Sequence, residues 1–345
     1  MSELATPAAS VAAVPRRMRW LWYLAAAAVI AVLPLVFTDS YWRTNLIVCA
    51  INVLLAIGLD FILGYAGQLN LGQSAFYGIG AYVSTLLIIR LGVPFWPAFL
   101  CGVAAAGISG MLLSLFAVRL RGHYLAIASL GFAVITYEIL LNWISLTQGP
   151  LGIYAIQPPP PLVLPGLAAI EFGNLANLLY LVAAFALLAY WLLDQLVRSP
   201  VGETLTAIRE DEVSAASLGI NCRAWKVFAF GIGSAIAGAA GCFYASFIGT
   251  LVPDAFFITG SFTMLAMVVI GGMGTLIGPV AGAILLTVLP EVLRGIGDAR
   301  LIIYGIALTL VVLFMPGGMV QAARLVAVRL RRWLPRRGLA ADARP

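Results

Sequence analysis

The sequence predicts an all-α polytopic membrane protein with about ten transmembrane helices. Hydrophobic residues make up 62% of the 345 positions and charged residues only 10%, whereas soluble domains carry about 25% charged residues. Apolar runs close to the length of about 20 residues that a helix needs to cross a bilayer recur along the chain. The basic residues lie mainly beside these runs, so the net charge of +6 indicates membrane anchoring and not nucleic-acid binding.

The apolar runs are the candidate spans, and eight to ten of them are expected to cross the membrane. In chain order they are Trp20–Phe37, Thr44–Leu63, Ser74–Ile89, Phe95–Val118, Tyr124–Leu146, Asn174–Leu193, Val227–Thr250, Phe257–Gly272, Leu276–Leu293 and Leu301–Met315. Ser74–Ile89 and Phe257–Gly272 are short, which is compatible with re-entrant or broken helices. The first run resembles a signal peptide but lacks a convincing small-residue cleavage site, so we interpret it as an uncleaved helix.

The distribution of basic residues predicts that both termini are cytoplasmic. With ten spans and an inside N-terminus, 16 of the 20 Lys and Arg residues fall on the cytoplasmic side, as the positive-inside rule requires. The chain then divides into an N-terminal tail (1–19), a transmembrane domain (20–316) and a basic tail (317–345). Its long outside loop (147–173) contains Pro158–Pro161, which forms either a rim for a soluble partner or a plain connection.

One cytoplasmic loop (194–226) is unusually polar and has the signals of a structured hairpin. Arg198–Lys226 carries eight of the 34 charged residues. Ser199 and Pro200 are typical of a helix start. An apolar stripe at helical spacing follows them, and Gly219 is suited to end the helical run. The hypothesis is a docking surface, and the alternative is a solvated connection between two spans.

Two apolar segments are interrupted by glycine, one in each half of the chain. Gly64–Ser84 places Gln68, Asn70, Gln73 and Ser74 between glycines. Gly271–Gly282 has Gly274, Gly278 and Gly282 four residues apart. Such paired interruptions point to a transport path in membrane transporters, but small residues at this spacing also let helices pack closely. We favour packing for the second segment and leave both interpretations open for the first.

Few ionisable residues lie at membrane depth, and Glu138 sits well inside the run Tyr124–Leu146. It is expected either to face a translocation cavity, or to bond to polar groups of a neighbouring helix or lie near the outer surface, and we favour the structural role. Asp60, Glu291 and Arg294 lie near span ends, where we expect them to reach the interface.

The sequence lacks the motifs of a self-sufficient pump or enzyme. There is no phosphate-binding loop, because the glycine-rich run Gly271–Gly278 contains no lysine. Histidine pairs, Cys/His clusters and nucleophile elbows are also missing from the sequence. We therefore predict that the chain is not an enzyme and binds neither a metal nor a nucleotide cofactor. Energy for transport would enter through a partner.

Several blocks of sequence together resemble a known family of permeases. These blocks are GYAGQLNLGQSAFYGIGAYVS, TQGPLGI, SPVGETLTAIREDEVSAASLGIN and VIGGMGTLIGPVAGAILLTVLPEVLR, which span most of the chain from about residue 45 to residue 319. In order and content they are similar to the permease subunits of branched-chain amino acid ABC importers, and most similar to the M-type subunit. The ending FMPGGM resembles the F-x-P-x-G-L of that family, with Met319 in place of leucine.

This resemblance implies an ABC importer permease fold in the cell inner membrane and a set of partners. They are a second, H-type permease, two cytoplasmic ATPases that bind ATP and Mg²⁺, and a periplasmic substrate-binding protein. It also implies that the polar loop couples to an ATPase, with Gly219 matching the conserved glycine of that segment. The implied coupling residues are Ile208, Arg209, Glu210, Asp211, Glu212, Ala215, Ala216, Gly219, Ile220 and Asn221.

The resemblance implies import of leucine, isoleucine and valine by alternating access. Related permeases also move urea, short amides and other amino acids, so these substrates stay as alternatives. A self-contained secondary transporter or channel is the rival from a different class, and a structural scaffold without solute flux is a third possibility. The path residues expected from the sequence are Gln68, Asn70, Gln73, Ser74 and Glu138.

Overall fold

The computed structural model describes residues 16–117, 123–161 and 171–294, together with 305, 309 and 318–322. The helices of the main described ranges are α1 (Arg16–Val36), α2 (Ser40–Asp60), η1 (Phe61–Tyr65), α3 (Gln73–Leu91), α4 (Phe95–Ala117), α5 (His123–Asn142), α6 (Ile144–Thr147), η2 (Gly149–Leu151), α7 (Leu175–Val197), α8 (Pro200–Glu210), α9 (Glu212–Ser217), α10 (Cys222–Ile248), η3 (Pro253–Phe256), α11 (Ile258–Gly271) and α12 (Ile277–Val292). The described residues are thus all-α, as predicted. The tenth predicted span and most of both tails lie outside them.

The first nine predicted runs all appear as apolar helices. Seven helices in the described ranges are long and apolar enough to cross a membrane, and two shorter apolar helices cover Tyr23–Pro34 and Ile277–Val292. α3 is a continuous helix of 19 residues, so the predicted break lies just before it. α11 has 14 residues and follows the short η3.

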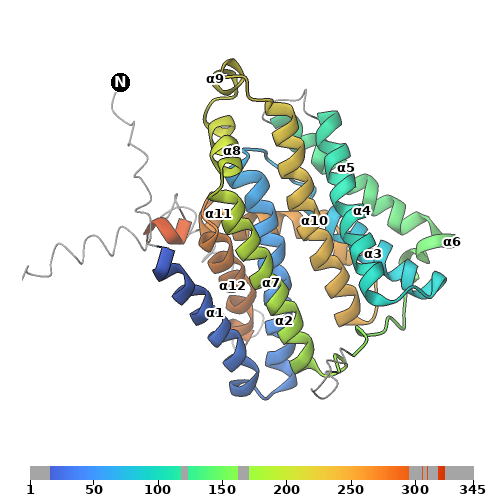
Figure 1. The fold of residues 1–345 in the computed structure, drawn as a ribbon. Helices are drawn as coiled ribbons and strands as arrows, with labels where there is room; N and C mark the ends of the chain where they lie inside the picture. Colours follow the sequence, from blue (N-terminus) through green and yellow to red (C-terminus); the bar gives the residue numbers. More distant parts are fainter. Residues whose placement is uncertain are drawn as a thin grey trace, which may run out of the picture.

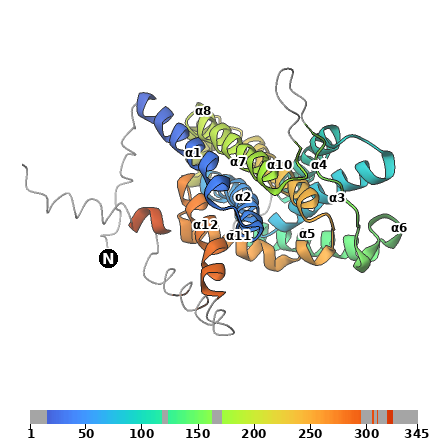
Figure 2. The same ribbon diagram turned by 90° about the horizontal axis from the view of Figure 1, so that it is seen from below.

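Helix α10 forms the centre of the bundle and packs against α2, α3 and α4 (Figures 1 and 2). Small residues allow this close approach. A Cβ placed on Gly241 would meet the Tyr77 carbonyl of α3, and one placed on Gly110 of α4 would meet Ser234 of α10. Gly110 and Gly241 therefore serve helix packing, as small residues do in other membrane bundles.

The exit of α7 toward the polar loop is fixed by a buried acid. Asp194 accepts a hydrogen bond of 2.6 Å from the Tyr23 hydroxyl of α1. Its other carboxylate oxygen accepts one of 2.8 Å from Arg198 Nε. A buried carboxylate needs such partners, so these bonds hold the end of α7, where the polar loop begins.

The opposite end of the bundle carries the described part of the long loop (147–173). Ile153 pairs with Leu251 in an isolated antiparallel bridge through bonds of 2.9 and 2.8 Å. Pro158–Pro161 has no regular secondary structure, and residues 162–170 lie outside the described part. The bridge ties this loop to the segment that follows α10.

Candidate functional site

The polar loop folds into a compact helical hairpin, which occupies residues 198–221. Ser199 caps α8 by accepting a bond of 3.2 Å from the Val201 amide, and Pro200 is the first helical residue. The predicted boundary at Lys226 was wrong by about one helical turn. α10 already begins at Cys222, because the Asn221 side chain caps it by accepting a bond from the Ala224 amide.

Asp211 connects the two short helices of the hairpin. It ends α8, and its Oδ1 accepts bonds of 2.9 and 3.2 Å from the amides of Val213 and Ser214 at the start of α9. Its Oδ2 accepts a bond of 2.5 Å from the Ser214 hydroxyl. These donors, the Ser214 hydroxyl above all, stabilise the carboxylate and lower the pKa of Asp211 from its ordinary value. At neutral pH Asp211 is therefore a charged helix cap.

Gly219 ends α9, as predicted from the sequence. Its φ is +83°, a left-handed conformation that glycine adopts without a side-chain clash. A Cβ at this position would meet no atom within 4 Å. The conformation of the backbone, and not lack of space within this chain, therefore accounts for glycine here.

The hairpin has its own small hydrophobic core. Ile208, Ala215 and Cys222 are buried against one another, with Ile220 and Trp225 packed beside them. An ion pair of 2.7 Å between Lys226 Nζ and Glu212 closes the hairpin against α10. These contacts give the hairpin a packed core and tie it to α10.

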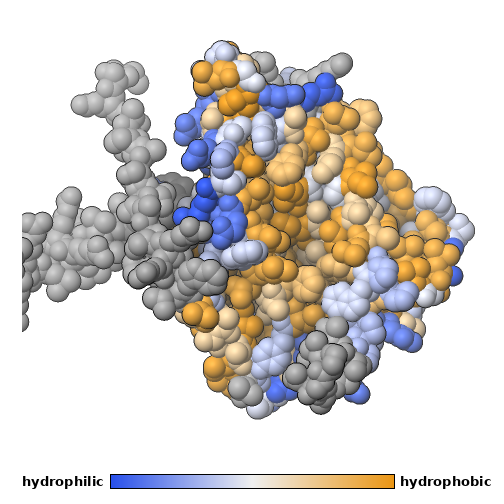
Figure 3. Space-filling model, viewed as in Figure 1, coloured by the Kyte–Doolittle hydropathy of each residue, from blue (hydrophilic) through white to orange (hydrophobic). Residues whose placement is uncertain are grey.

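Two large apolar side chains are exposed at the tip of the hairpin. Val213 is 69% exposed and Leu218 is 81% exposed. In Figure 3, hydrophobic residues cover the projecting tip at α9 and hydrophilic ones lie beside it. An exposed apolar patch with a polar surround is typical of a protein contact surface. The coupling residues that the resemblance implied include neither side chain, because they were taken from the family motif. Two apolar residues within a polar loop were the available signal.

The first interruption forms a tightly bonded turn before α3. Gln73 and Asn70 are both buried and joined by a bond of 2.9 Å from Asn70 Nδ2 to Gln73 Oε1. Gln68 is also buried and donates a bond of 3.0 Å to the carbonyl of Lys226 at the base of the hairpin. Ser74 is held by Ser261 of α11, whose hydroxyl accepts from its amide at 2.9 Å.

The polar side chains of this turn thus have protein partners in the described conformation. Ser129 of α5 likewise accepts a bond of 2.9 Å from the Leu71 amide. The sequence did not identify Ser129 and Ser261 as members of this cluster, because single serines in apolar helices carry no local signal. The cluster joins the start of α3 to α5, α10 and α11.

The second interruption lies between α11 and α12 and is packed backbone to backbone. A Cβ on Gly278 would meet the Gly272 carbonyl, and one on Gly282 would meet the Met267 carbonyl. Gly274 has a φ of +73°. The geometry thus agrees with the packing interpretation for Gly278 and Gly282, whereas Gly274 is a turn glycine between the two helices.

The hairpin and both interruptions meet at one place. Arg209 Nη1 donates a hydrogen bond to the Gly64 carbonyl at the first interruption. Asp60 Oδ1 accepts a bond of 2.8 Å from the Gly274 amide at the second. The expectation that Asp60 reaches the membrane interface was wrong, because the residue is 0% exposed. Its carboxyl group satisfies a backbone amide inside the protein instead.

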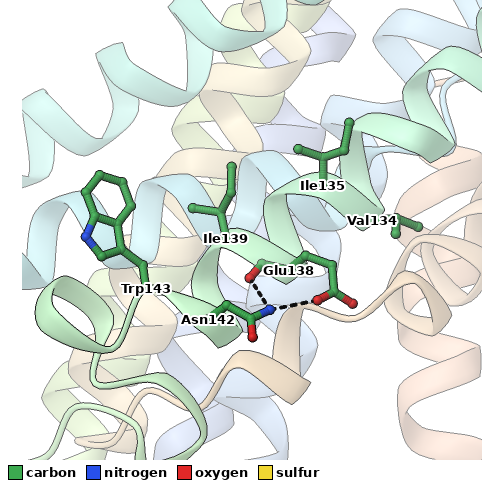
Figure 4. A pocket seen from close by; sticks show the side chains of 6 residues that line it. All are labelled: Val134, Ile135, Glu138, Ile139, Asn142 and Trp143. Atoms are coloured by element: carbon green, nitrogen blue, oxygen red, sulfur yellow. Dashed lines mark hydrogen bonds between the residues drawn. The ribbon is translucent and has the colours of Figure 1, made fainter.

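Glu138 lies apart from this cluster, on the exposed face of α5. Its Oε2 accepts a bond of 2.8 Å from Asn142 Nδ2. Both residues line a shallow groove of about 540 Å³ with Val134, Ile135, Ile139 and Trp143 (Figure 4). The structure therefore brings four of the five expected path residues together and places the fifth on another surface.

Comparison with known proteins identifies similar sequences. A family described as "Branched-chain amino acid transport system / permease component" matches residues 43–316. The high-affinity branched-chain amino acid transport system permease protein LivM of Escherichia coli is 35% identical over 297 residues, which cover 79% of this chain and 68% of LivM.

More distant relatives include a second type of permease. LivH of Salmonella typhimurium, a permease protein of the same kind of system, is 27% identical over 255 residues, covering 68% of this chain and 79% of LivH. BraD of Pseudomonas aeruginosa is 26% identical over 288 residues, covering 77% of this chain and 90% of BraD. No solved structure gives a significant match.

Proposed function

The chain belongs to the family of permease components of branched-chain amino acid transport systems, and we propose that it forms part of the membrane path of an ATP-driven importer for leucine, isoleucine and valine. Because the chain is similar to both LivM and LivH, the proposed path lies between this M-type subunit and a second, H-type permease. The pair operates in the cell inner membrane, with both termini of this chain in the cytoplasm.

The exposed apolar tip of the packed polar hairpin carries this proposal. Val213 and Leu218 project beyond the hairpin core, and leaving such side chains in water is unfavourable. A cytoplasmic protein that covers them would bury apolar surface and be linked through the hairpin to α7 and α10. We assign this role to a partner ATPase, with ATP and Mg²⁺ bound by two such subunits.

The substrate is proposed to arrive from a periplasmic binding protein at the end of the bundle that carries the Ile153–Leu251 bridge. Glu138 and Asn142 lie in an exposed groove on α5, where a carboxylate is costly if it faces lipid. We propose that this face lines the path beside the second permease. One wall of the proposed path is the hydrogen-bonded turn before α3, and the alternating-access movement rearranges its bonds. The residues of this wall are Gln68, Asn70, Gln73 and Ser74.

Reconstitution with and without partners tests the proposal. Proteoliposomes containing this chain, the second permease, both ATPases and the binding protein should take up leucine only when ATP is supplied to the ATPases. Urea and a short amide serve as comparison substrates, and their preferential uptake would contradict the assignment of substrate. Uptake by this chain alone in an ion gradient would instead show a secondary transporter, and no flux under either condition would indicate a scaffold.

A further inference from the structure

We propose that Arg209, Asp60, Gly64 and Gly274 form a joint through which the hairpin moves both helix interruptions, with Arg209 as its positioning residue. The proposal rests on the proposed function, since it assumes that a partner ATPase moves the hairpin. It goes further by assigning the link between that movement and the membrane bundle to one side chain.

The first part of the joint is the contact of Arg209 with the interruption before α3. Its guanidinium donates to the Gly64 carbonyl, where η1 ends the helical run that begins with α2. The stem of the side chain crosses Gly67, whose φ is +66° and where a Cβ would lie 2.9 Å from Arg209 Cγ. The turn is therefore shaped to let this arginine reach Gly64.

The second part of the joint is Gly274, which lies against both Arg209 and Asp60. Its amide donates to Asp60 Oδ1 at 2.8 Å. A Cβ placed on it would lie 2.8 Å from Arg209 Nη1. A Cβ on Gly64 would in turn meet both Asp60 Oδ1 and the Gly274 amide nitrogen. The two interruptions are thus in direct contact, and Arg209 ends at their junction.

One carboxyl oxygen of Asp60 is left over in this arrangement. Oδ2 is buried and has no hydrogen-bond partner among the described residues. A buried carboxyl oxygen without a donor is unfavourable, and a guanidinium is a suitable donor for it because it offers several N–H groups in a rigid fork. A second arrangement of the joint is therefore available, in which Arg209 leaves Gly64 and bonds to Asp60 Oδ2.

These two arrangements give the hairpin two discrete positions, which is the kind of element that transmits a conformational change. Arg209 sits in the last turn of α8, so a movement of α8 carries the guanidinium with it. When Arg209 moves from Gly64 to Asp60, its bond to the interruption before α3 breaks, while the bond between the Gly274 amide and Asp60 Oδ1 remains.

The test uses the complete reconstituted importer with Arg209→Gln and Asp60→Asn variants. The asparagine side chain retains an oxygen for the Gly274 amide, which makes Asp60→Asn the milder change to the fold. Both variants should still copurify with the ATPases but move about tenfold less leucine per ATP, equivalent to about 1.4 kcal/mol of coupling. Arg209→Lys should restore part of the coupling, because it keeps the positive charge.

Arg90→Gln is the matched control for these variants. Arg90 also donates to backbone carbonyls, those of Ser145 and Leu146, but it lies far along the chain from the hairpin and its contacts do not include the joint. Its loss should leave leucine transported per ATP unchanged. Unchanged coupling in Arg209→Gln would overturn the proposal. Loss of ATPase binding in that variant would also overturn it, because Arg209 would then belong to the docking surface.

A labelling measurement reports the movement of the joint without relying on transport. Met273 is exposed beside Gly274, and Cys101 is the exposed cysteine among the four. In a Cys101→Ser background, the maleimide reactivity of Met273→Cys should change when ATP is added to the complex. The change should vanish with Arg209→Gln. A response to ATP that persists in the Arg209→Gln variant would overturn the joint, whereas failure of the unmodified complex to use ATP would overturn the proposed function.

Discussion

Arg209 donates a hydrogen bond to the carbonyl of Gly64, 145 residues earlier in the chain. This bond connects the polar hairpin to the point where the long helix beginning with α2 ends. The neighbouring bond from Gln68 to the Lys226 carbonyl makes a second connection between the same two segments. The hairpin is therefore fixed to the bundle interior as well as to its flanking helices. These bonds link its position to that of the polar turn before α3.

Replacing Gly219 by proline should abolish leucine uptake and stimulation of the ATPases while leaving the chain inserted in the membrane. Proline fixes φ near −65°, whereas Gly219 requires +83°, and it removes the amide that bonds to the Ala216 carbonyl. Gly219→Asn is the matched control, because asparagine tolerates the left-handed conformation. Normal uptake by a correctly expressed proline variant would contradict the coupling role of the hairpin.

Charged substitutions at the hairpin tip should weaken association with the ATPases. Val213→Asp or Leu218→Asp places a carboxylate where an apolar contact is proposed, and an effect of about 2 kcal/mol is expected for a central contact residue. Copurification of the ATPases measures this association. Leu151→Asp is the control, because Leu151 is equally apolar and exposed but lies in the opposite loop. Equal losses for the tip and Leu151 variants would count against a specific tip contact.

The start of α9 should depend on pH through Asp211. Because the folded-state pKa of Asp211 is lowered, its capping bonds stabilise the hairpin above the unfolded pKa of about 3.9. This stabilisation should fall away as the pH drops below that value and through the lower folded pKa. Hydrogen exchange at the Val213 and Ser214 amides, corrected for intrinsic rates, measures it.

The variants of Asp211 provide the controls for that measurement. Asp211→Ser keeps a cap and should retain protection at low pH, whereas Asp211→Ala should lack it at every pH. If the protection of the Val213 and Ser214 amides in the wild-type protein stays constant through the acidic range, the Asp211 carboxylate does not stabilise the start of α9.

Gly282→Ala should lower the thermal stability of the purified protein. The added Cβ would meet the Met267 carbonyl, and such overpacking of a close interface costs about 1–3 kcal/mol. Gly131→Ala is the matched control on α5, since a Cβ there meets no atom within 4 Å. Similar melting temperatures for the two variants would be inconsistent with close packing of α11 against α12.

Substituting Glu138 should affect uptake more than stability. The side chain is exposed and its carboxylate bonds to Asn142, one turn away on the same helix, so Glu138→Gln should change the folding free energy by no more than about 0.5 kcal/mol. Leucine uptake by the assembled importer should nevertheless fall if the groove lines the path. Unchanged uptake would remove Glu138 from the proposed path.

The sequence predicted most elements of the fold because each has a strong local signal. Long apolar runs defined the spans, Ser199 and Pro200 marked the start of α8, and Gly219 marked the end of α9. Helix ends were less exact, since α10, capped by Asn221, begins at Cys222, about one turn before the predicted apolar run.

The contacts between distant segments could not be predicted in the same way. Asp60 was expected at the membrane interface because it stands near the end of an apolar run. In the folded chain, however, it is buried and accepts a hydrogen bond from the Gly274 amide. The meeting of Arg209 with Gly64 likewise has no local signature. Such contacts depend on how α8, η1 and the α11–α12 connection pack together, which single-sequence patterns do not encode.

Photo-crosslinking from position 218 is the most direct test of the claim that a partner ATPase engages the hairpin. A photoreactive amino acid at Leu218, in the assembled importer, should form a crosslink to an ATPase subunit, and the same residue at Leu151 should not. The yield should change when ATP binds and is hydrolysed. A complex that imports leucine with ATP but shows no crosslink from position 218 would contradict the account.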